Sequence, residues 1–394
     1  MTVQLLNMIG DGLLTVGATI LIAHGSDPGA DLTLILLSSS AVGIAALFGS
    51  SIMLDSINRR AALILLDVLR ILAALLVTLY MTTSQSWVLA LAGSCVGLSV
   101  SVYRPALSAY IGDVFSTDQR TAANSLRSLA SKLSGVAGPA VAGILGALHV
   151  ERYAPAVAGI LAALSICAFL LGPKGTIKAD LERDAHPFAA FRYVWHRSWI
   201  FAVISQGAVQ IGFVSAPMSV LLPLWLAQHG ATAQYGFIVA IEAAGAAITA
   251  ILLIRIPRLR PEIAVPILLL QAPSVLVIAI NAPSWLLYPA SFALGVAMCL
   301  FGVLWIGALQ EQVPATMLGR VLSVDALGNG AFSVAGLALA GFALERFSPA
   351  SIAAFMTVVL IASVVGALLV PGVLSLDPWM NRLDAGCRNE ESAL

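Results

Sequence analysis

The chain of 394 residues is strongly apolar: hydrophobic residues make up 59% of it and charged residues only 10%. Soluble domains carry roughly 25% charged residues, and so few charges could not cover the surface of a water-soluble protein of this size. Most of that surface must therefore face lipid. Twenty basic and twenty acidic residues give a net charge of zero, and the sequence has no basic tract for binding nucleic acid.

Apolar runs of about 18 to 26 residues recur along the chain, separated by short turns that are polar or contain Pro and Gly. Continuously apolar runs predict helices, because the strands of a membrane barrel alternate instead. The first run lacks a preceding basic region and is too long for the core of a signal peptide. We predict an all-α membrane protein with twelve transmembrane helices, at residues 3–23, 32–54, 61–80, 87–111, 128–149, 154–172, 199–226, 233–254, 262–280, 285–311, 321–344 and 350–371.

Basic residues in the predicted loops lie almost entirely on one side. If the N-terminus is cytoplasmic, the outer loops hold only Arg152 and Arg346. Because inner loops carry an excess of Lys and Arg, this asymmetry predicts that both termini are cytoplasmic. The inner segments hold Arg59, Arg60, Arg120, Arg127, Lys132, Lys174, Lys178, Arg183, Arg192, Arg197, Arg255, Arg258, Arg260, Arg320, Arg382 and Arg388.

The longest connection lies near the middle of the chain and predicts two halves. It is charged at first and then has Phe188, Phe191 and Trp195 at helical spacing, which predicts a cytoplasmic linker with an interfacial helix; a regulatory or partner-binding segment is the alternative. An internal repeat supports the division, because Val136–Gly143 returns as Val334–Gly341 with six of eight residues identical. We predict a six-helix bundle at 1–172, the linker at 173–198, a second six-helix bundle at 199–372 and a cytoplasmic tail at 373–394.

Charged residues within predicted helices are candidates for function. Each costs about 2.5–3.5 kcal/mol at a helix centre unless it is paired or faces water. Asp67 and Arg70 are three residues apart and are expected to neutralise each other. Asp11 and Arg104 both lie roughly 11–12 Å from the inner face, which predicts a charge pair in a central cavity. Asp67 is the rival partner for Arg104.

Glu242 lies near the predicted midplane, with no basic residue of its own half at that depth. Enclosure in apolar surroundings favours the neutral form of a carboxyl group, so Glu242 is the predicted proton-coupling residue and Asp11 the second candidate. A permanently protonated Glu that bonds a neighbouring helix is the alternative. Four polar or aromatic residues are candidates for the substrate cavity, with a packing role as the alternative: Gln206, Gln210, Gln271 and Trp305.

The turn after the second predicted helix reads Ser51-Ile-Met-Leu-Asp55-Ser56-Ile-Asn-Arg59-Arg60. It resembles the signature loop of the major facilitator superfamily, with Ser51 in place of the usual Gly and Ser56 in place of the usual basic residue. Further segments are similar to the drug/proton-antiporter branch, above all to its macrolide-efflux and enterobactin-export proteins. These segments are Tyr103–Ala109, Ala123–Ser125, Gly138–Pro139, Phe191–Trp195 and Leu318–Ser323.

The resemblance implies the major facilitator fold, in which helices 1, 4, 7 and 10 line a central cavity. It places Asp55 near the start of helix 11 when the cytoplasmic side is closed, so Asp55, Arg59 and Arg60 are expected in a gating loop between the halves. For the two arginines a purely topological role is an equal alternative. The motif of helix 5 is one glycine short, and its Gly138, Pro139 and Gly143 are expected to form a hinge.

The leading hypothesis is a proton antiporter of the bacterial inner membrane that exports a small amphipathic compound such as a drug, a macrolide-like metabolite or a siderophore. A lipid or lysolipid flippase is the alternative within the same fold, and a transport-inactive sensor or assembly partner is the alternative from another class. No nucleophile elbow, metal-ligand cluster or phosphate-binding loop is found, so neither an enzyme nor a cofactor or metal is expected. The expected partners are the substrate, protons and lipid, and the expected state is a monomer.

Overall fold

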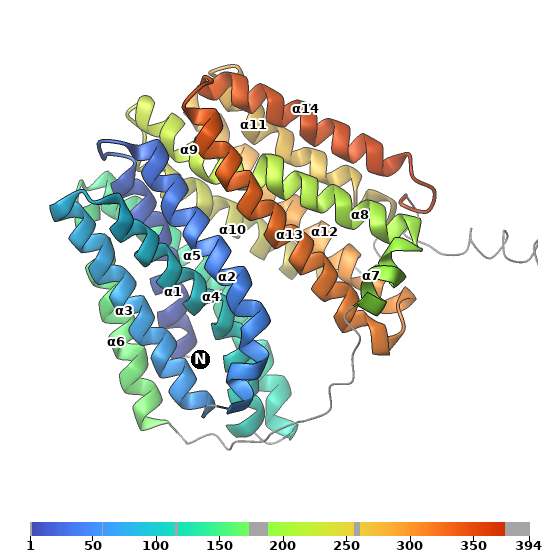
Figure 1. Ribbon diagram of the computed structural model, residues 1–394, viewed down its shortest axis with the longest axis horizontal. Helices are drawn as coiled ribbons and strands as arrows, with labels where there is room; N and C mark the ends of the chain where they lie inside the picture. Colours follow the sequence, from blue (N-terminus) through green and yellow to red (C-terminus); the bar gives the residue numbers. More distant parts are fainter. Residues whose placement is uncertain (1, 57, 115–116, 173–187, 256–260, 375–394) are drawn as a thin grey trace, which may run out of the picture.

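The computed structural model describes residues 2–56, 58–114, 117–172, 188–255 and 261–374, and every regular element in these residues is helical (Figure 1). The first group of helices comprises α1 (Thr2–Ile22), α2 (Pro28–Ser56), α3 (Arg59–Thr83), α4 (Ser86–Val114), α5 (Thr117–Ala147) and α6 (Ala154–Leu171). The second group comprises α7 (Phe188–Trp195), α8 (Ser198–Gln210), the π-helical segment η2 (Ile211–Ser215), α9 (Ala216–Gln228), α10 (Gln234–Leu253), the 3-10 segment η4 (Pro266–Gln271), α11 (Ala272–Ala279), α12 (Leu287–Gln312), α13 (Ala315–Leu344) and α14 (Pro349–Leu368).

Ten helical stretches in the described residues are long and apolar enough to cross a membrane. One of them, Ser198–Gln228, joins α8, η2 and α9 into a single run. The predicted ninth helix, at 262–280, is represented by a shorter apolar stretch, Pro266–Ala279. Helix α5 begins at Thr117 rather than at the predicted 128. Its first turns are polar but rich in residues that favour helices, such as Ala, Leu, Arg and Gln, so the helix extends beyond the apolar run.

The predicted amphipathic helix after the mid-chain connection is present as α7. Phe191 and Trp195 are exposed on it, and their rings stack with centroids 6.1 Å apart. The rest of the predicted linker, residues 173–187, and nearly all of the predicted tail lie outside the described residues.

Small residues allow the helices of each group to approach closely. A Cβ atom on Gly97 of α4 would lie 2.0 Å from the carbonyl oxygen of Ser39 on α2, and one on Gly295 of α12 would lie 1.9 Å from that of Glu242 on α10. Real side chains do not tolerate such distances. Glycine at these crossings gives the close backbone contact on which membrane helices depend in place of hydrophobic association.

The repeated octets occupy equivalent places in the two groups. Gly138 on α5 packs against Gly12 of α1, where a Cβ would lie 3.0 Å from the Cα of Gly12. Its counterpart Gly336 on α13 packs against Gly212 of η2, where a Cβ would lie 2.0 Å from the carbonyl oxygen. Each octet therefore packs its helix closely against the first long helix of its own group.

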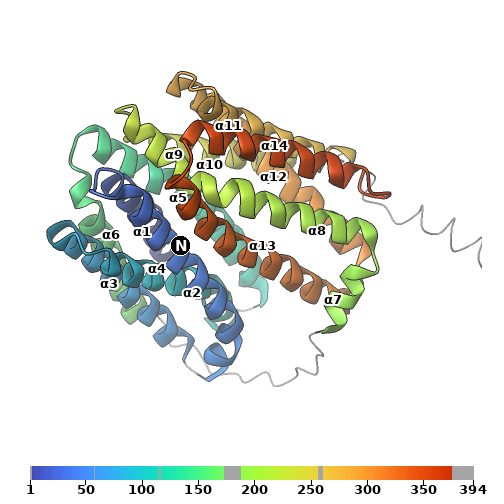
Figure 2. The same cartoon turned by 45° about the horizontal axis from the view of Figure 1, so that its top comes forward.

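The last glycine of each octet faces the other group. Gly143 on α5 lies against Gly236 on α10, and Gly341 on α13 lies against Thr33 on α2. Figures 1 and 2 show the two groups meeting along α2 and α13 near the end where α1 turns into α2, which we name the closed end. The helices of the two groups diverge toward the other end, where α6 ends and α7 begins, which we name the linker end.

Candidate functional site

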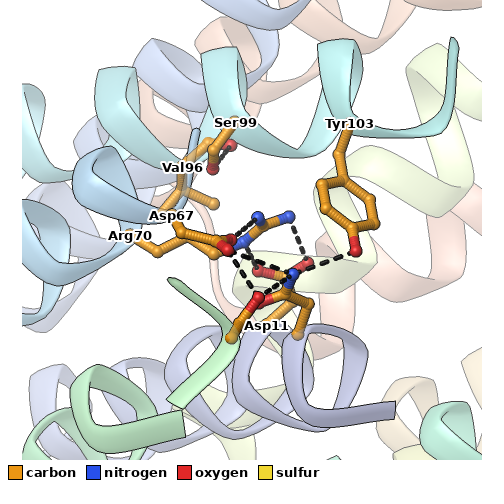
Figure 3. Close-up of polar contacts among 8 residues, drawn as sticks. Asp11, Asp67, Arg70, Val96, Ser99 and Tyr103 are labelled. Atoms are coloured by element: carbon orange, nitrogen blue, oxygen red, sulfur yellow. Dashed lines mark hydrogen bonds and ion pairs between the residues drawn. The ribbon is translucent and has the colours of Figure 1, made fainter. Parts of the chain in front are cut away.

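A buried ionic cluster joins α1 and α3 (Figure 3). The guanidinium of Arg70 donates to both carboxylate oxygens of Asp11, with Nε–Oδ1 at 2.6 Å and Nη2–Oδ2 at 3.0 Å. Its Nη1 donates to Oδ1 of Asp67 at 2.7 Å. Arg70 and Asp67 are almost fully buried, whereas 22% of the Asp11 side chain is exposed. One arginine therefore satisfies two acids, and both Asp11 and Arg70 line the cavity described below.

Neutral polar groups complete the cluster. The second oxygen of Asp67 accepts a hydrogen bond from Ser165 Oγ at 2.5 Å, and Asn7 Nδ2 donates to the hydroxyl of Tyr103 at 2.9 Å. The Tyr103 ring also lies under the Arg70 guanidinium, 4.5 Å from its centroid, in a cation–π arrangement. Because buried charges are tolerated only when they are paired and hydrogen-bonded, this set stabilises two acids and a base inside the helix group.

The predicted ion pair between Asp11 and Arg104 is not formed. Arg70 holds the Asp11 carboxylate instead, and the predicted Asp67–Arg70 pair is present at 2.7 Å. Neighbouring residues of an α-helix point about 100° apart. Since Tyr103 of α4 points into the cluster, Arg104 must point away from it, and its side chain is exposed. The rival pair of Arg104 with Asp67 is excluded for the same reason.

Arg104 and Asp11 nevertheless line the same cavity, of about 430 Å³, in the first group. Its described lining holds four cationic side chains and a single carboxylate. One of the cations, Arg127, donates a hydrogen bond to the hydroxyl of Ser108. The described residues supply no ion pair to Arg104, Arg127 or Lys132. The lining comprises Gln4, Met8, Asp11, Arg70, Val100, Tyr103, Arg104, Leu107, Arg127, Ser131 and Lys132.

A chain of amides crosses the second group and brings the three predicted glutamines together. Gln206 Nε2 donates to Gln210 Oε1 at 2.6 Å, and Gln210 donates in turn to Gln271. Gln271 Nε2 then donates to Ser215 Oγ at 3.2 Å. The π-helical segment η2 begins directly after Gln210 and ends at Ser215. Its wider turn is a local irregularity of the kind frequently found at functional sites.

Trp305 joins the same region through Asp325, an acid that was not among the sequence candidates. Its indole Nε1 donates to Asp325 Oδ2 at 3.1 Å, and Asn329 Nδ2 donates to Oδ1 at 2.9 Å. Gln206, Gln210, Trp305, Asp325 and Asn329 line a second cavity of about 90 Å³. Asp325 falls inside the predicted helix at 321–344, so the criterion that selected Glu242, an acid within an apolar run, was sufficient to find it.

Glu242 is half-buried on α10 and lines neither of these two cavities. Its neighbour Ala243 faces α5, where a Cβ on Gly135 would lie 3.7 Å away. Among the described residues, no hydrogen-bond or ion-pair partner is found for the Glu242 carboxyl group. It therefore lies close to the crossing of α5 and α10, apart from the amide chain.

The two arginines of the predicted gating loop contact their own group in this structure. Arg59 pairs with Asp113 near the end of α4. Arg60 donates to the carbonyl oxygens of Leu170 and Gly172 (2.9 Å to the latter) at the end of α6, where a cation satisfies unpaired carbonyls. Asp55 belongs to α2, but its side chain lies outside what the structure describes.

The predicted hinge of helix 5 lies where α5 meets two partners. The helix continues through Pro139 without interruption. Gly138 contacts α1 of the same group and Gly143 contacts α10 of the other, so this segment is a crossing point between the groups.

Comparison with known proteins identifies the family. Residues 1–262, more than half of the chain, match the Major Facilitator Superfamily. This chain belongs to the major facilitator superfamily. No curated protein sequence matches it closely enough to count as a relative. Membership makes the chain a multi-pass membrane transporter rather than an enzyme, and it confirms the superfamily that the loop after the second helix resembles.

Solved structures of other transporters share the major facilitator fold. The nucleoside transporter NupG has a TM-score of 0.74 at 12% identity, covering 93% of this chain and 97% of that one. A peptide transporter POT in complex with sulfate has a TM-score of 0.73 at 14% identity, covering 97% and 94%. A bacterial homologue of the human lysosomal transporter Spinster, in an inward-facing and unoccupied conformation, has a TM-score of 0.63 at 15% identity, covering 95% and 93%.

Proposed function

We propose that this chain is a secondary active transporter that exports a small amphipathic organic compound by alternating access. One observation carries the proposal: each helix group contains its own polar cavity, while the two groups touch through small residues, as at Gly143 with Gly236. Small residues at these contacts allow one group to rock against the other while each keeps its own core, which is how such repeats expose a site to either side in turn.

The membrane arrangement that we propose has twelve spans in two bundles, 1–172 and 199–372, with the linker at 173–198 and the tail at 373–394 inside a bacterial cell. It adds α5 and the stretch Pro266–Ala279 to the ten long apolar helices. The positive-inside asymmetry supports it. Reporter fusions placed after Gly172 and after Leu394 should both report the cytoplasm, and an outside signal at either position would contradict the arrangement.

We propose proton antiport as the source of energy. Glu242 is the leading coupling residue, because it lies beside the α5–α10 crossing, a contact between the groups that must change during rocking. Asp11 is the second, because it is the most exposed acid of the ionic cluster and lines the first cavity. The membrane potential supplies about 2.3 kcal/mol per charge per 100 mV. Asp55 with Arg59 and Arg60 would act as the gate at the linker end, and Gly138, Pro139 and Gly143 as the hinge.

The substrate side of the proposal rests on the second cavity, in which Gln206, Gln210 and Trp305 surround the small space and Gln271 supports them. The drug/proton-antiporter branch, which several segments of the chain resemble, suggests drugs, macrolide-like metabolites and siderophores as cargo. Nucleosides and peptides belong in the same test panel, because NupG is a nucleoside transporter and POT a peptide transporter.

The experiment is efflux from an efflux-deficient bacterial host that expresses the chain, measured over this compound panel. Export of one compound class, abolished by a protonophore, is the expected result. Binding that continues unchanged without any export would favour the transport-inactive sensor. Export that the protonophore does not reduce would refute proton antiport but would still support a transport function.

A lipid or lysolipid flippase is the second candidate, and an apolar groove favours it. The groove has a volume of about 560 Å³ and lies between η2, α9, α13 and α14, with Phe213, Phe342 and Phe355 in its lining. An acyl chain fits such a surface. Reconstituted protein and a fluorescent lysolipid separate the candidates, because a flippase would move the lysolipid between leaflets and an exporter of soluble compounds would not.

A further inference from the structure

The cavity of the first group has a strong charge imbalance. Arg70 is the only one of its four cations that has an acid partner in the described residues, since it binds Asp11 and Asp67. Arg104, Arg127 and Lys132 contribute positive charge to the same space, and the part of the chain that the structure describes gives them no matching carboxylate. Asp11, the single acid in the lining, is already neutralised by Arg70. The net charge of the cavity lining is therefore positive.

Topology signalling does not explain the depth of Arg104. Arg104 lies well inside α4 (Ser86–Val114), whereas Arg127 and Lys132 lie near the inner end of the predicted span at 128–149 in α5. Basic residues that set orientation act from loops and helix ends, whereas a cation near a helix centre costs about 2.5–3.5 kcal/mol unless it is paired or meets water. Arg104 faces the same cavity as Arg127 and Lys132, and three cations around one space attract a negatively charged ligand.

The second cavity has the opposite character. Asp325 is the only ionisable side chain among its described lining residues, and aromatic rings lie beside it: Phe301 stacks on Trp305 with centroids 6.4 Å apart. An anionic group is repelled there and attracted to the first cavity. Uncharged amide or aromatic groups suit this lining instead.

We propose that the first cavity binds the anionic group of the transported compound, a carboxylate or a phosphate ester, through Arg104, Arg127 and Lys132. Guanidinium groups can bind two anionic oxygens at once, and the ammonium of Lys132 adds a point charge. The cargo is then an organic anion with an apolar body. This inference rests on the proposed transport function and names the chemical class of its substrate.

The test uses the purified full-length protein in nanodiscs of phosphatidylcholine, a lipid without net charge. Four probes are compared: inorganic sulfate against chloride at equal ionic strength, and 1-naphthoate, 1-naphthamide and 1-naphthylmethylammonium, which share one ring system. Thermal stabilisation and quenching of tryptophan fluorescence report binding. We expect sulfate and naphthoate to stabilise the protein, and the amide and the ammonium to bind at least ~10-fold more weakly than naphthoate.

Substitutions of the cavity cations test whether these side chains bind the anion. Arg104→Gln and Lys132→Gln should each weaken naphthoate binding about 10-fold and leave naphthamide binding unchanged. Arg346→Gln is the matched control, because Arg346 is exposed and pairs with Glu345 outside the cavity. Three results would each overturn the inference. They are equal binding of the three naphthyl probes, preference for the ammonium, and no thermal stabilisation of the wild-type protein by sulfate or naphthoate.

Two further experiments follow. The first distinguishes a lipid headgroup from the cargo as the source of the anion, and the second distinguishes the anion site from the proposed transport function. In phosphatidylglycerol nanodiscs naphthoate should still bind; a lipid that stabilises the protein through Arg104 and Lys132 and excludes naphthoate would show a headgroup site and overturn the cargo inference. Proteoliposomes loaded with the probes then report movement. Charge-selective binding without movement would support the anion site and refute the transporter, whereas movement without charge selectivity would refute the anion site alone.

Discussion

At the scale of single residues, the first group depends on an arginine shared by two acids. Arg70 makes two hydrogen bonds to Asp11 and one to Asp67, and Asp67 receives a further bond from Ser165. Loss of one partner from a buried pair leaves an uncompensated charge, which typically costs 3–5 kcal/mol. Asp11 is the least buried member, so it can change its interactions most cheaply when the cavity reorganises.

A double-mutant cycle should identify the true partner of Asp11. Asp11→Asn combined with Arg70→Gln should deviate from additivity by about 1–3 kcal/mol, because the two side chains share two hydrogen bonds. Asp11→Asn combined with Arg104→Gln is the matched control and should be additive within about 0.5 kcal/mol. Thermal unfolding of the purified variants in detergent measures both. Strong coupling to Arg104 with none to Arg70 would contradict the arrangement in Figure 3.

Glu242→Gln tests the proposed coupling residue. The amide imitates the protonated carboxyl group and cannot release a proton, so the variant should keep exchange of cargo down its gradient but lose uphill export. Proteoliposomes with and without an imposed proton gradient measure the two activities. Asp11→Asn is the comparison. If Glu242→Gln still concentrates cargo at the wild-type rate, Glu242 is not the coupling site and Asp11 becomes the better candidate.

At the scale of elements, glycines decide how closely helices cross. A Cβ on Gly236 of α10 would lie 2.4 Å from the backbone nitrogen of Gly143 and 2.6 Å from the carbonyl oxygen of Pro139 on α5. The neighbouring atoms are backbone and cannot rotate away. The α5–α10 crossing is therefore the most sensitive contact between the groups, and its counterpart is the approach of Gly341 on α13 to Thr33 on α2.

Gly236→Ala should destabilise the protein by about 1–3 kcal/mol, the usual effect of overpacking, and should reduce transport because α5 and α10 are forced apart. Gly366→Ala on α14 is the control. A Cβ there meets no atom within 4 Å, and removing a glycine from a helix interior stabilises by about 0.5–1 kcal/mol. Thermal unfolding and efflux are measured on both. Equal stability of the two variants would mean that α5 and α10 are further apart than described.

At the scale of the whole molecule, the groups are held together at the closed end and diverge toward the linker end (Figure 1). The proposed topology makes the linker end cytoplasmic, so this conformation faces inward. Transport then requires the contacts of the closed end to open. The repeat explains why those contacts come in two matching sets: the octets on α5 and α13 each carry one glycine that faces the opposite group.

A disulfide across the closed end should arrest the cycle. A Cβ on Gly341 would lie 3.4 Å from that of Thr33, close to the 3.5–4.5 Å typical of disulfides. Thr33→Cys with Gly341→Cys, with the four native cysteines replaced by alanine, should cross-link under oxidation and lose transport, and a reductant should restore it. The pair Ala74→Cys with Gly159→Cys has a similar spacing of 3.6 Å within the first group and should cross-link without loss of transport. Full transport by the cross-linked Thr33–Gly341 variant would refute the rocking motion.

Much of the fold was determined by properties that are local in the sequence. Continuous apolar runs specify membrane helices because lipid offers no partner for backbone groups, and the repeated octet marked α5 and α13 as equivalent helices. The Asp67–Arg70 pair could be predicted because both residues belong to one helix turn. The superfamily was recognisable from the loop that contains Asp55, Arg59 and Arg60.

Only the tertiary structure decided which charges meet across helices. Spacing along the chain gives the depth of Asp11 and Arg104 but not the direction in which each side chain points, and rotation about the α4 axis turns Arg104 away from the ionic cluster and Tyr103 into it. The amide chain from Gln206 to Gln271 likewise joins helices far apart in sequence. Depth follows from a count of residues, whereas rotation follows from how small residues let neighbouring helices settle against one another.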